Sequence, residues 1–202
     1  MKKTIWIPIV IGLMGGGLSF LILVANFRIL VPLGEGASLG GTEIFGTLAA
    51  ALGGPIAAVI TALLNGAGGY LITRDVLPWP TSLYVASADL MAHIIAMLAA
   101  AFCYRFLHER AKKRTPALLG GWVLIVAIYY FVVLTPIQVL LINTFVPGFG
   151  TYMDFVSIVW PEFLVTTIVT TLIWFALPAH YRRPQWVEAK QMPDQSGGIQ
   201  GE

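Results

Sequence analysis

Apolar segments long enough to cross a lipid bilayer recur along most of this 202-residue chain. A helix needs about 20 apolar residues to span the hydrocarbon core, which is roughly 30 Å thick. Only 11% of the residues are charged, whereas soluble domains average about 25%. We therefore predict an all-α integral membrane protein. The net charge of +2 does not indicate nucleic-acid binding, and the single cysteine excludes an internal disulfide.

Six segments are predicted to cross the membrane as a six-transmembrane-helix bundle. The first follows Lys2 and Lys3, and we expect it to be retained because it is longer than the apolar part of a cleaved signal. The segments are residues 5–27, 42–53, 55–72, 82–106, 117–143 and 155–177.

The second and third segments lie in a stretch of small residues that reads LGGTEIFGTLAAALGGPIAAVITALLNGAGGYL. Gly53, Gly54 and Pro55 divide this stretch, because a glycine pair favours a tight turn and proline is well tolerated at the start of a helix. The alternative is one long helix that is kinked at Pro55, since membrane helices tolerate proline.

The basic residues predict the orientation, because cytoplasmic flanks are enriched in lysine and arginine. Six crossings with both termini in the cytoplasm leave only Arg28 and Arg74 outside, whereas five crossings would place Arg182 and Arg183 opposite the basic run 105–114. We therefore predict a multi-pass protein of the plasma membrane. The cytoplasmic residues would be Lys2, Lys3, Arg105, Arg110, Lys112, Lys113, Arg114, Arg182, Arg183 and Lys190.

Polar residues within the predicted spans fall in the outer half of the bundle or near its middle. Glu43 is expected at the outer start of the second segment. An acidic residue at the centre of a membrane helix costs about 3 kcal/mol, so such residues usually face a cavity or a partner. The predicted substrate-binding residues are Glu43, Asn65, Tyr70, Asp89, His93, Gln138, Asn143 and Glu162.

Two features of this set leave alternatives open. Asp89 and His93 share one helical face at a spacing of four, which suits either a binding site or a structural hydrogen bond. Tyr129 and Tyr130 are adjacent, so a regular helix would direct only one of them into a pocket.

The outer clustering favours an outward-open pocket for a small solute over a continuous ion channel. The acids outnumber the intramembrane cations, which indicates a cationic or amine-bearing ligand. No catalytic constellation, metal-ligand spacing or cofactor motif is evident, so we predict no enzyme activity, cofactor or metal.

The first segment carries small residues at a spacing of four, namely Gly12 with Gly16 and Gly15 with Ser19. Such a face lets a second helix approach closely in lipid. It suits either a partner protein or another helix of the same chain.

The chain resembles the substrate-binding S component of energy-coupling factor (ECF) transporters. It is predicted to be a short six-helix protein with both ends inside, a small-residue face on the first helix, a glycine-rich outer loop and a Gly/Ala-rich helix pair joined by LGGP. The resemblance covers about residues 5–177. It implies capture of a vitamin-like micronutrient from outside, together with a membrane coupling protein and cytoplasmic ATPase subunits. It also implies that Gly12, Gly15, Gly16 and Ser19 meet the coupling protein.

We predict a substrate-binding membrane domain over residues 1–178 and, from its polar composition rich in Pro, Gly and Gln, a short cytoplasmic tail over 179–202 that is disordered beyond its first few residues. The segment LGGPIAAVITALLNG also looks like the membrane domain of autolysin-regulating sensor kinases, and a stand-alone proton-coupled carrier is a further alternative. The chain has no phosphate-binding loop of the type Gly-x-x-x-x-Gly-Lys-[Ser/Thr], so ATP hydrolysis would come from a partner.

Overall fold

The computed structural model describes residues 3–25, 29–30, 38–39, 42–110, 115–178, 181–184 and 186. This part of the chain is helical apart from short connections and one pair of two-residue strands, in which Ile29 lies opposite Leu39. The elements are α1 (Lys3–Val24), β1 (Ile29–Leu30), β2 (Ser38–Leu39), α2 (Thr42–Val76), α3 (Thr81–Arg110), α4 (Thr115–Ala127), the π-helix η1 (Ile128–Leu134), α5 (Thr135–Phe145) and α6 (Tyr152–Ala176).

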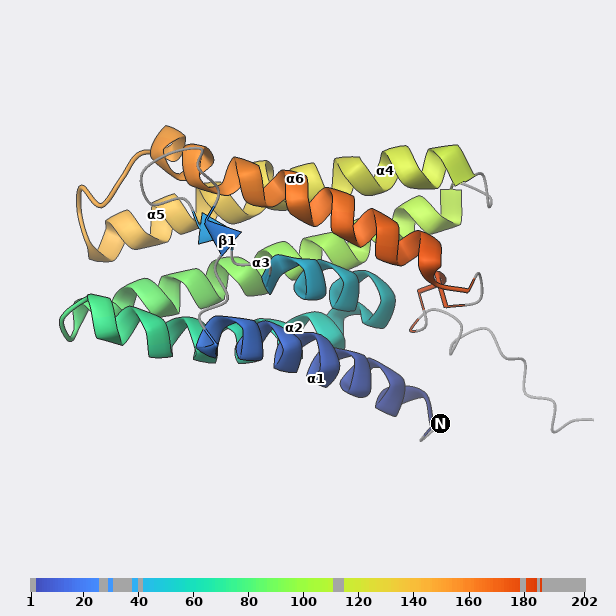
Figure 1. Ribbon diagram of the computed structural model, residues 1–202, viewed down its shortest axis with the longest axis horizontal. Helices are drawn as coiled ribbons and strands as arrows, with labels where there is room; N and C mark the ends of the chain where they lie inside the picture. The colour runs from blue at the N-terminus through green and yellow to red at the C-terminus, as the bar shows by residue number, and fades with distance from the viewer. Residues whose placement is uncertain are drawn as a thin grey trace, which may run out of the picture.

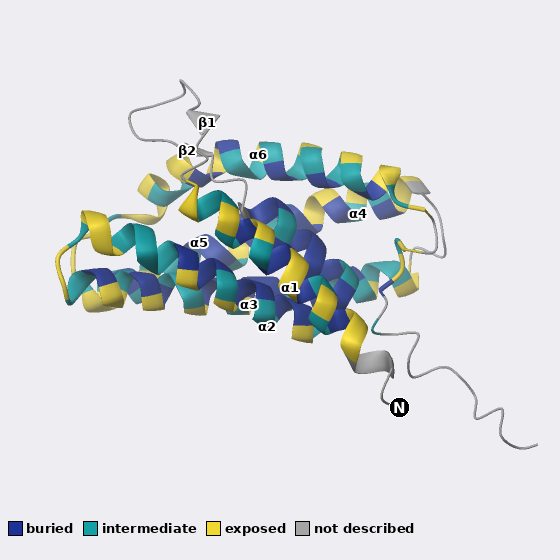
Figure 2. Ribbon diagram, turned by 60° about the horizontal axis from the view of Figure 1, so that its bottom comes forward, coloured by how far each residue is buried: buried dark blue, intermediate teal, exposed yellow. Residues whose placement is uncertain are grey.

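Five helices in the described residues are long and apolar enough to cross a membrane, with α4, η1 and α5 forming one continuous span. Their outward faces carry large apolar side chains, among them Leu13, Leu124, Leu140 and Leu172, each more than half exposed. Buried residues gather toward the interior of the bundle (Figure 2). An apolar surface on every helix suits contact with lipid, which supports the predicted class of membrane protein.

Helix α2 folds back on itself at Gly54, as the glycine pair before Pro55 predicted. Gly54 has φ 75° and ψ −160°, far from helical values. Asn65 Nδ2 lies 3.3 Å from Glu43 Oε1, although 22 residues of straight helix would separate them by about 33 Å. The alternative of one kinked but extended helix is therefore wrong, and α2 consists of two antiparallel segments, 42–53 and 55–76 (Figure 1).

Helix α1 packs against both segments of α2 through its small residues. A Cβ atom on Gly15 would lie 2.6 Å from Ala49 Cβ, and one on Gly12 would lie 2.9 Å from Ala57 Cα. Thr61 Oγ1 also donates a hydrogen bond of 3.1 Å to the Gly12 carbonyl. Only glycine permits helices to approach this closely.

The small-residue face predicted for partner docking is thus occupied by the chain itself. Gly16 contacts Leu64 and Thr61 of α2, and Ser19 is fully buried. Of the two alternatives left open by the spacing, packing within the chain is the one that this structure shows. A coupling protein would have to displace α2 to contact Gly12, Gly15, Gly16 and Ser19 directly.

The helices form two layers, with α1, α2 and α3 in one and α4, η1, α5 and α6 in the other (Figure 1). The first layer presents mainly alanine to the shared core, including Ala58, Ala96 and Ala101. The second layer fills the core with large side chains such as Trp122 and Tyr129. Small residues on one side and aromatic residues on the other give close packing between the layers.

One end of the bundle is closed by the segment that follows α6. Tyr104 Oη donates to the Arg182 carbonyl at 2.6 Å and accepts from Trp174 Nε1 at 2.8 Å. The Arg182 side chain donates to the carbonyls of Phe175 and Leu177, which end α6. The first part of the predicted tail, within residues 181–186, therefore has defined contacts, while residues 187–202 lie outside the described residues.

The Trp186 side chain packs directly against the Gly54 turn. A Cβ atom on Gly54 would overlap the indole ring, and the Arg105 guanidinium lies 5.2 Å from the ring centroid. Phe102 meets the same ring edge to face at 6.1 Å. The turn therefore requires glycine both for its backbone conformation and for the space that Trp186 occupies.

We expect Gly54→Ala to lower the free energy of unfolding by about 1–3 kcal/mol, because φ 75° with ψ −160° is a region that essentially only glycine adopts. Thermal unfolding of the purified protein in detergent measures the loss. The matched control is Gly120→Ala, where a Cβ atom would meet nothing within 4 Å. Equal unfolding temperatures for the two variants would contradict the assigned turn.

Candidate functional site

Glu43 lies at the centre of a buried polar cluster between the two layers. Its side chain is 4% exposed. Glu43 Oε1 lies 2.8 Å from His93 Nε2 and accepts a hydrogen bond of 3.3 Å from Asn65 Nδ2. Glu43 Oε2 accepts a hydrogen bond from the Tyr129 hydroxyl. One carboxyl group thus joins both segments of α2, helix α3 and the π-helix η1.

Asp89 and Gln138 extend the cluster toward the start of α3 and the end of α5. His93 Nδ1 lies 2.8 Å from the Asp89 backbone carbonyl and 3.4 Å from Asp89 Oδ1. Gln138 Nε2 donates to Asp89 Oδ1 at 2.5 Å, which links the two layers a second time. The Asp89 side chain is 31% exposed, whereas His93 is 9% exposed. Asp89 is therefore a more accessible part of the cluster than His93 or Glu43.

Glu43 lies deeper than its position in the sequence predicted. His93 is 12 residues from the start of α3 and 17 from its end, or about 18 Å and 26 Å along the helix axis. Glu43 is the second residue of segment 42–53, but it contacts His93, so the start of this segment lies in the interior of the bundle. The reason is that segment 42–53 has only 12 residues, about 18 Å of helix.

Tyr129 was not among the predicted site residues, yet its hydroxyl bonds to Glu43, whereas the hydroxyl of Tyr130 lies beside Thr166 of α6, so only one of the two adjacent tyrosines reaches the cluster. Both are fully buried. The Thr135 N–H bonds to the Tyr130 carbonyl, five residues back, which is the wider turn of a π-helix. The proline at position 136 has no N–H to donate, so a regular helical ladder cannot continue through it.

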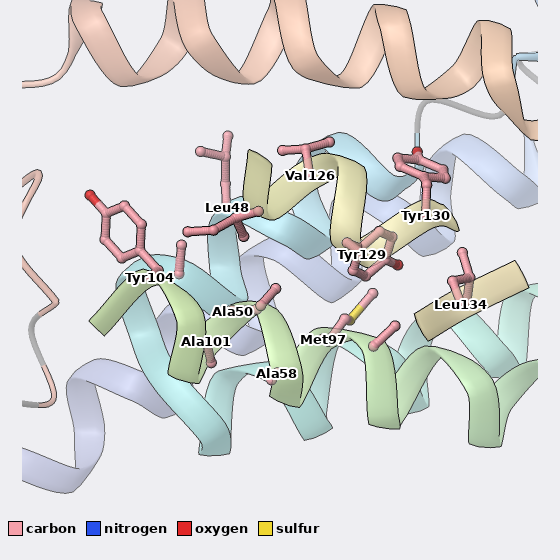
Figure 3. Close-up of a cluster of buried hydrophobic side chains, with 14 of the residues drawn as sticks. Leu48, Ala50, Ala58, Met97, Ala101, Tyr104, Val126, Tyr129, Tyr130 and Leu134 are labelled. Atoms are coloured by element: carbon pink, nitrogen blue, oxygen red, sulfur yellow. The ribbon is translucent and has the colours of Figure 1, made fainter. Parts of the chain in front are cut away.

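The π-helix separates the two tyrosine side chains. Tyr129 lies beside Met97 of α3, whereas Tyr130 extends toward α6 (Figure 3), where its hydroxyl lies 2.9 Å from Thr166 Oγ1. The two rings meet edge to face at 5.1 Å. A proline in the middle of an apolar span was the signal in the sequence for such irregularity.

Of the eight predicted substrate-binding residues, five meet in the cluster: Glu43, Asn65, Asp89, His93 and Gln138. The other three lie elsewhere. Tyr70 lines an apolar groove of about 240 Å³ between α2 and α3. Asn143 donates to the carbonyls of Val139 and Gly150, which ties α5 to the loop before α6. Glu162 of α6 is close enough to Tyr129 and Tyr130 to interact electrostatically.

The cluster can bind a polar group, because it combines carboxylates with amide, imidazole and phenol groups in an apolar surrounding. Hydrogen bonds and charges are stronger in such a surrounding than in water. The described residues include no group of three or more His, Cys, Asp and Glu side chains that could hold a metal ion. The two carboxyl groups of the cluster are acceptors for hydrogen bonds and counter-charges for a cation.

We expect Tyr129→Phe to lower the free energy of unfolding by about 0.5–2 kcal/mol, because it removes a donor to a buried carboxyl group. Denaturation of the protein in lipid–detergent micelles measures this change. Tyr84→Phe is the control, because Tyr84 is 42% exposed and its ring stacks on Phe145 without need of the hydroxyl. A loss in the control as large as that in Tyr129→Phe would refute a specific role for the Tyr129 hydroxyl.

A scan against family models, a search of curated proteins and a search of solved structures each find no match to this chain. The resemblance to S components therefore rests on the sequence pattern described above.

Proposed function

We propose that this chain is the membrane-embedded substrate-capture subunit of an uptake system, which binds a small, vitamin-like solute at the Glu43–His93–Asp89 cluster. The observation that carries the proposal is the convergence of polar side chains from both layers into one buried network. Ionisable residues inside a membrane bundle are costly and commonly mark a substrate or ion pathway. Sites between helices of a bundle are also common places for small ligands.

The charges of the cluster favour a cationic or amine-bearing solute. Glu43 and Asp89 supply two carboxyl groups, and His93 supplies at most one positive charge. With both carboxyls ionised and His93 protonated, one negative charge remains to attract a cation. The partial exposure of Asp89 makes it the residue that we expect a solute to meet first.

The protein is proposed to lie in the plasma membrane. The arrangement of the helix ends supports six crossings with both termini in the cytoplasm. The start of α1, the Gly54 turn, the junction of α3 with α4 and the end of α6 lie at one end of the bundle (Figure 1). Arg105, Arg110 and Arg182 belong to that end, and Arg74 belongs to the other. This segregation follows the preference of basic residues for the cytoplasmic side.

The proposal includes separate energising subunits. The chain contains no nucleotide-binding loop, and so a membrane coupling protein and cytoplasmic ATPase subunits would supply the energy. In this scheme the solute is captured between the layers from the outer side, and the partners drive its release to the inside.

Impermeant maleimide labelling tests the proposed orientation. In a Cys103→Ser background we expect Asp75→Cys to react in intact cells and Ser196→Cys to react only after the membrane is permeabilised. Six crossings place residue 75 outside and residue 196 inside, whereas a fully spanning α2 would exchange them. Labelling of Ser196→Cys in intact cells, with Asp75→Cys protected, would overturn the six-crossing arrangement.

Thermal-shift and equilibrium binding measurements test the proposed site and ligand class. We use thiamine, pyridoxamine and choline as cationic or amine-bearing probes, and biotin and nicotinate as anionic ones. We expect stabilisation by at least one cationic probe. We also expect Asp89→Asn to weaken that binding at least tenfold, which corresponds to about 1.4 kcal/mol.

Asp75→Asn is the matched control, because it makes the same chemical change at a side chain that is 75% exposed. Binding of only anionic probes, or none, would contradict the proposed ligand class. Equal affinity of Asp89→Asn and Asp75→Asn for a bound probe would refute the assigned site.

A further inference from the structure

The hydrogen bonds of His93 define where its protons must be. Nδ1 lies 2.8 Å from the backbone carbonyl oxygen of Asp89. A carbonyl oxygen only accepts hydrogen bonds, so Nδ1 must carry a hydrogen. The remaining ring nitrogen, Nε2, then carries a hydrogen only if the imidazole ring is positively charged.

The contact between His93 Nε2 and Glu43 Oε1, at 2.8 Å, requires one proton between these atoms. Without that proton, a nitrogen lone pair would face a carboxylate oxygen at hydrogen-bond distance. The proton belongs either to an imidazolium that donates to a carboxylate or to a carboxylic acid that donates to a neutral imidazole. Both arrangements have the same total charge.

The other partners of Glu43 favour the carboxylate. Asn65 Nδ2 donates to Oε1, and the Tyr129 hydroxyl donates to Oε2. With His93 Nε2, three donors then reach one acceptor group, which a carboxylate can satisfy fully. If the shared proton were on Glu43 instead, Oε1 would have to donate to His93 Nε2 and at the same time accept from Asn65 as a neutral oxygen, which is a weaker acceptor than a carboxylate oxygen.

We propose that Glu43 and His93 form a proton-binding site inside the membrane, occupied in this structure as an imidazolium–carboxylate pair, and that loss of the proton releases segment 42–53 from α3. The proposal concerns the protein without a solute, and it does not depend on the proposed uptake function. Its ligand is a proton, and Asp89 is a more exposed member of the cluster than His93 or Glu43.

Among the described residues, the titratable groups around the pair come from three elements. Asp89 lies on α3 beside His93, Tyr129 and Tyr130 lie on η1, and Glu162 lies on α6. Helix α1 packs against α2 and has no acidic or basic residue between positions 6 and 24. Glu43 and Asp89, the two acids in contact with His93, favour its positive charge, because opposite charges attract strongly in an apolar interior.

Segment 42–53 is built so that it can respond to this proton. Its far end is attached through Gly54, whose backbone has φ 75° and ψ −160° and so forms no regular helical connection. Its near end is held by the hydrogen bonds of Glu43 to Asn65, His93 and Tyr129. Removal of the shared proton replaces attraction between Glu43 and His93 with repulsion, which we expect to loosen the segment about the Gly54 turn.

Nitrogen NMR of the full chain in lipid nanodiscs tests the protonation state directly. The chain has three histidines, and the ring signals of His93 are those lost in His93→Gln. At pH 7.5 we expect both ring nitrogens of His93 to carry hydrogen in the wild-type protein. We expect Glu43→Gln to convert His93 to the neutral form with hydrogen on Nδ1 only, and Glu162→Gln to leave the wild-type signals unchanged.

Hydrogen–deuterium exchange tests the link to segment 42–53. His93→Gln cannot hold the proton, so we expect faster amide exchange in residues 43–53 than in wild type at the same pH. His108→Gln is the control and should leave exchange in 43–53 unchanged.

A neutral His93 in the wild-type protein at pH 7.5 would overturn the proposed imidazolium–carboxylate pair, and this result does not require any variant to fold. Unchanged exchange in residues 43–53 of His93→Gln would overturn the release of the segment. Neither result bears on whether a solute binds, because no solute is present in either measurement.

Discussion

The carboxyl group of Glu43 is the constraint on which the arrangement of this protein depends. An ionised carboxyl group in an apolar interior costs several kcal/mol unless charge and hydrogen bonds compensate for it. Here Asn65, His93 and Tyr129 supply that compensation from α2, α3 and η1. The helices must therefore hold their relative positions for the carboxyl group to remain buried.

Small residues allow the chain to fold so that Glu43 reaches this buried position. The turn at Gly54 brings segment 42–53 back against segment 55–76, and the glycines of α1 let that helix approach both. Segment 42–53 is too short to span the hydrocarbon core, so its first residue lies within the bundle. The low side-chain volume of residues 39–71 thus has a consequence for the site as well as for packing.

In the described part of the chain, polar contacts join the two layers at two places, with apolar packing between them. Glu43 with Tyr129 and Asp89 with Gln138 form the first, and Tyr104 with Trp174 and the Arg182 carbonyl forms the second. Any motion that separates the layers must break one of these sets. The proposed capture of a solute and the proposed proton site both act on the first set, whereas the second closes the end where the basic residues gather.

The sequence by itself determined the class of protein, the helix break before Pro55 and most of the polar residues in the cluster, because these depend on local hydrophobicity, turn propensity and the cost of charge in lipid. Only the tertiary structure decided the depth of Glu43, the role of Tyr129 and the partner of the small-residue face. The depth of Glu43 follows from the length of segment 42–53 and from the direction in which it runs away from the Gly54 turn. Tyr129 faces the cluster because the wider turns of the π-helix before residue 136 change the direction of its side chain. These are contacts between residues distant in sequence, such as Glu43 and Tyr129, which are separated by 86 positions.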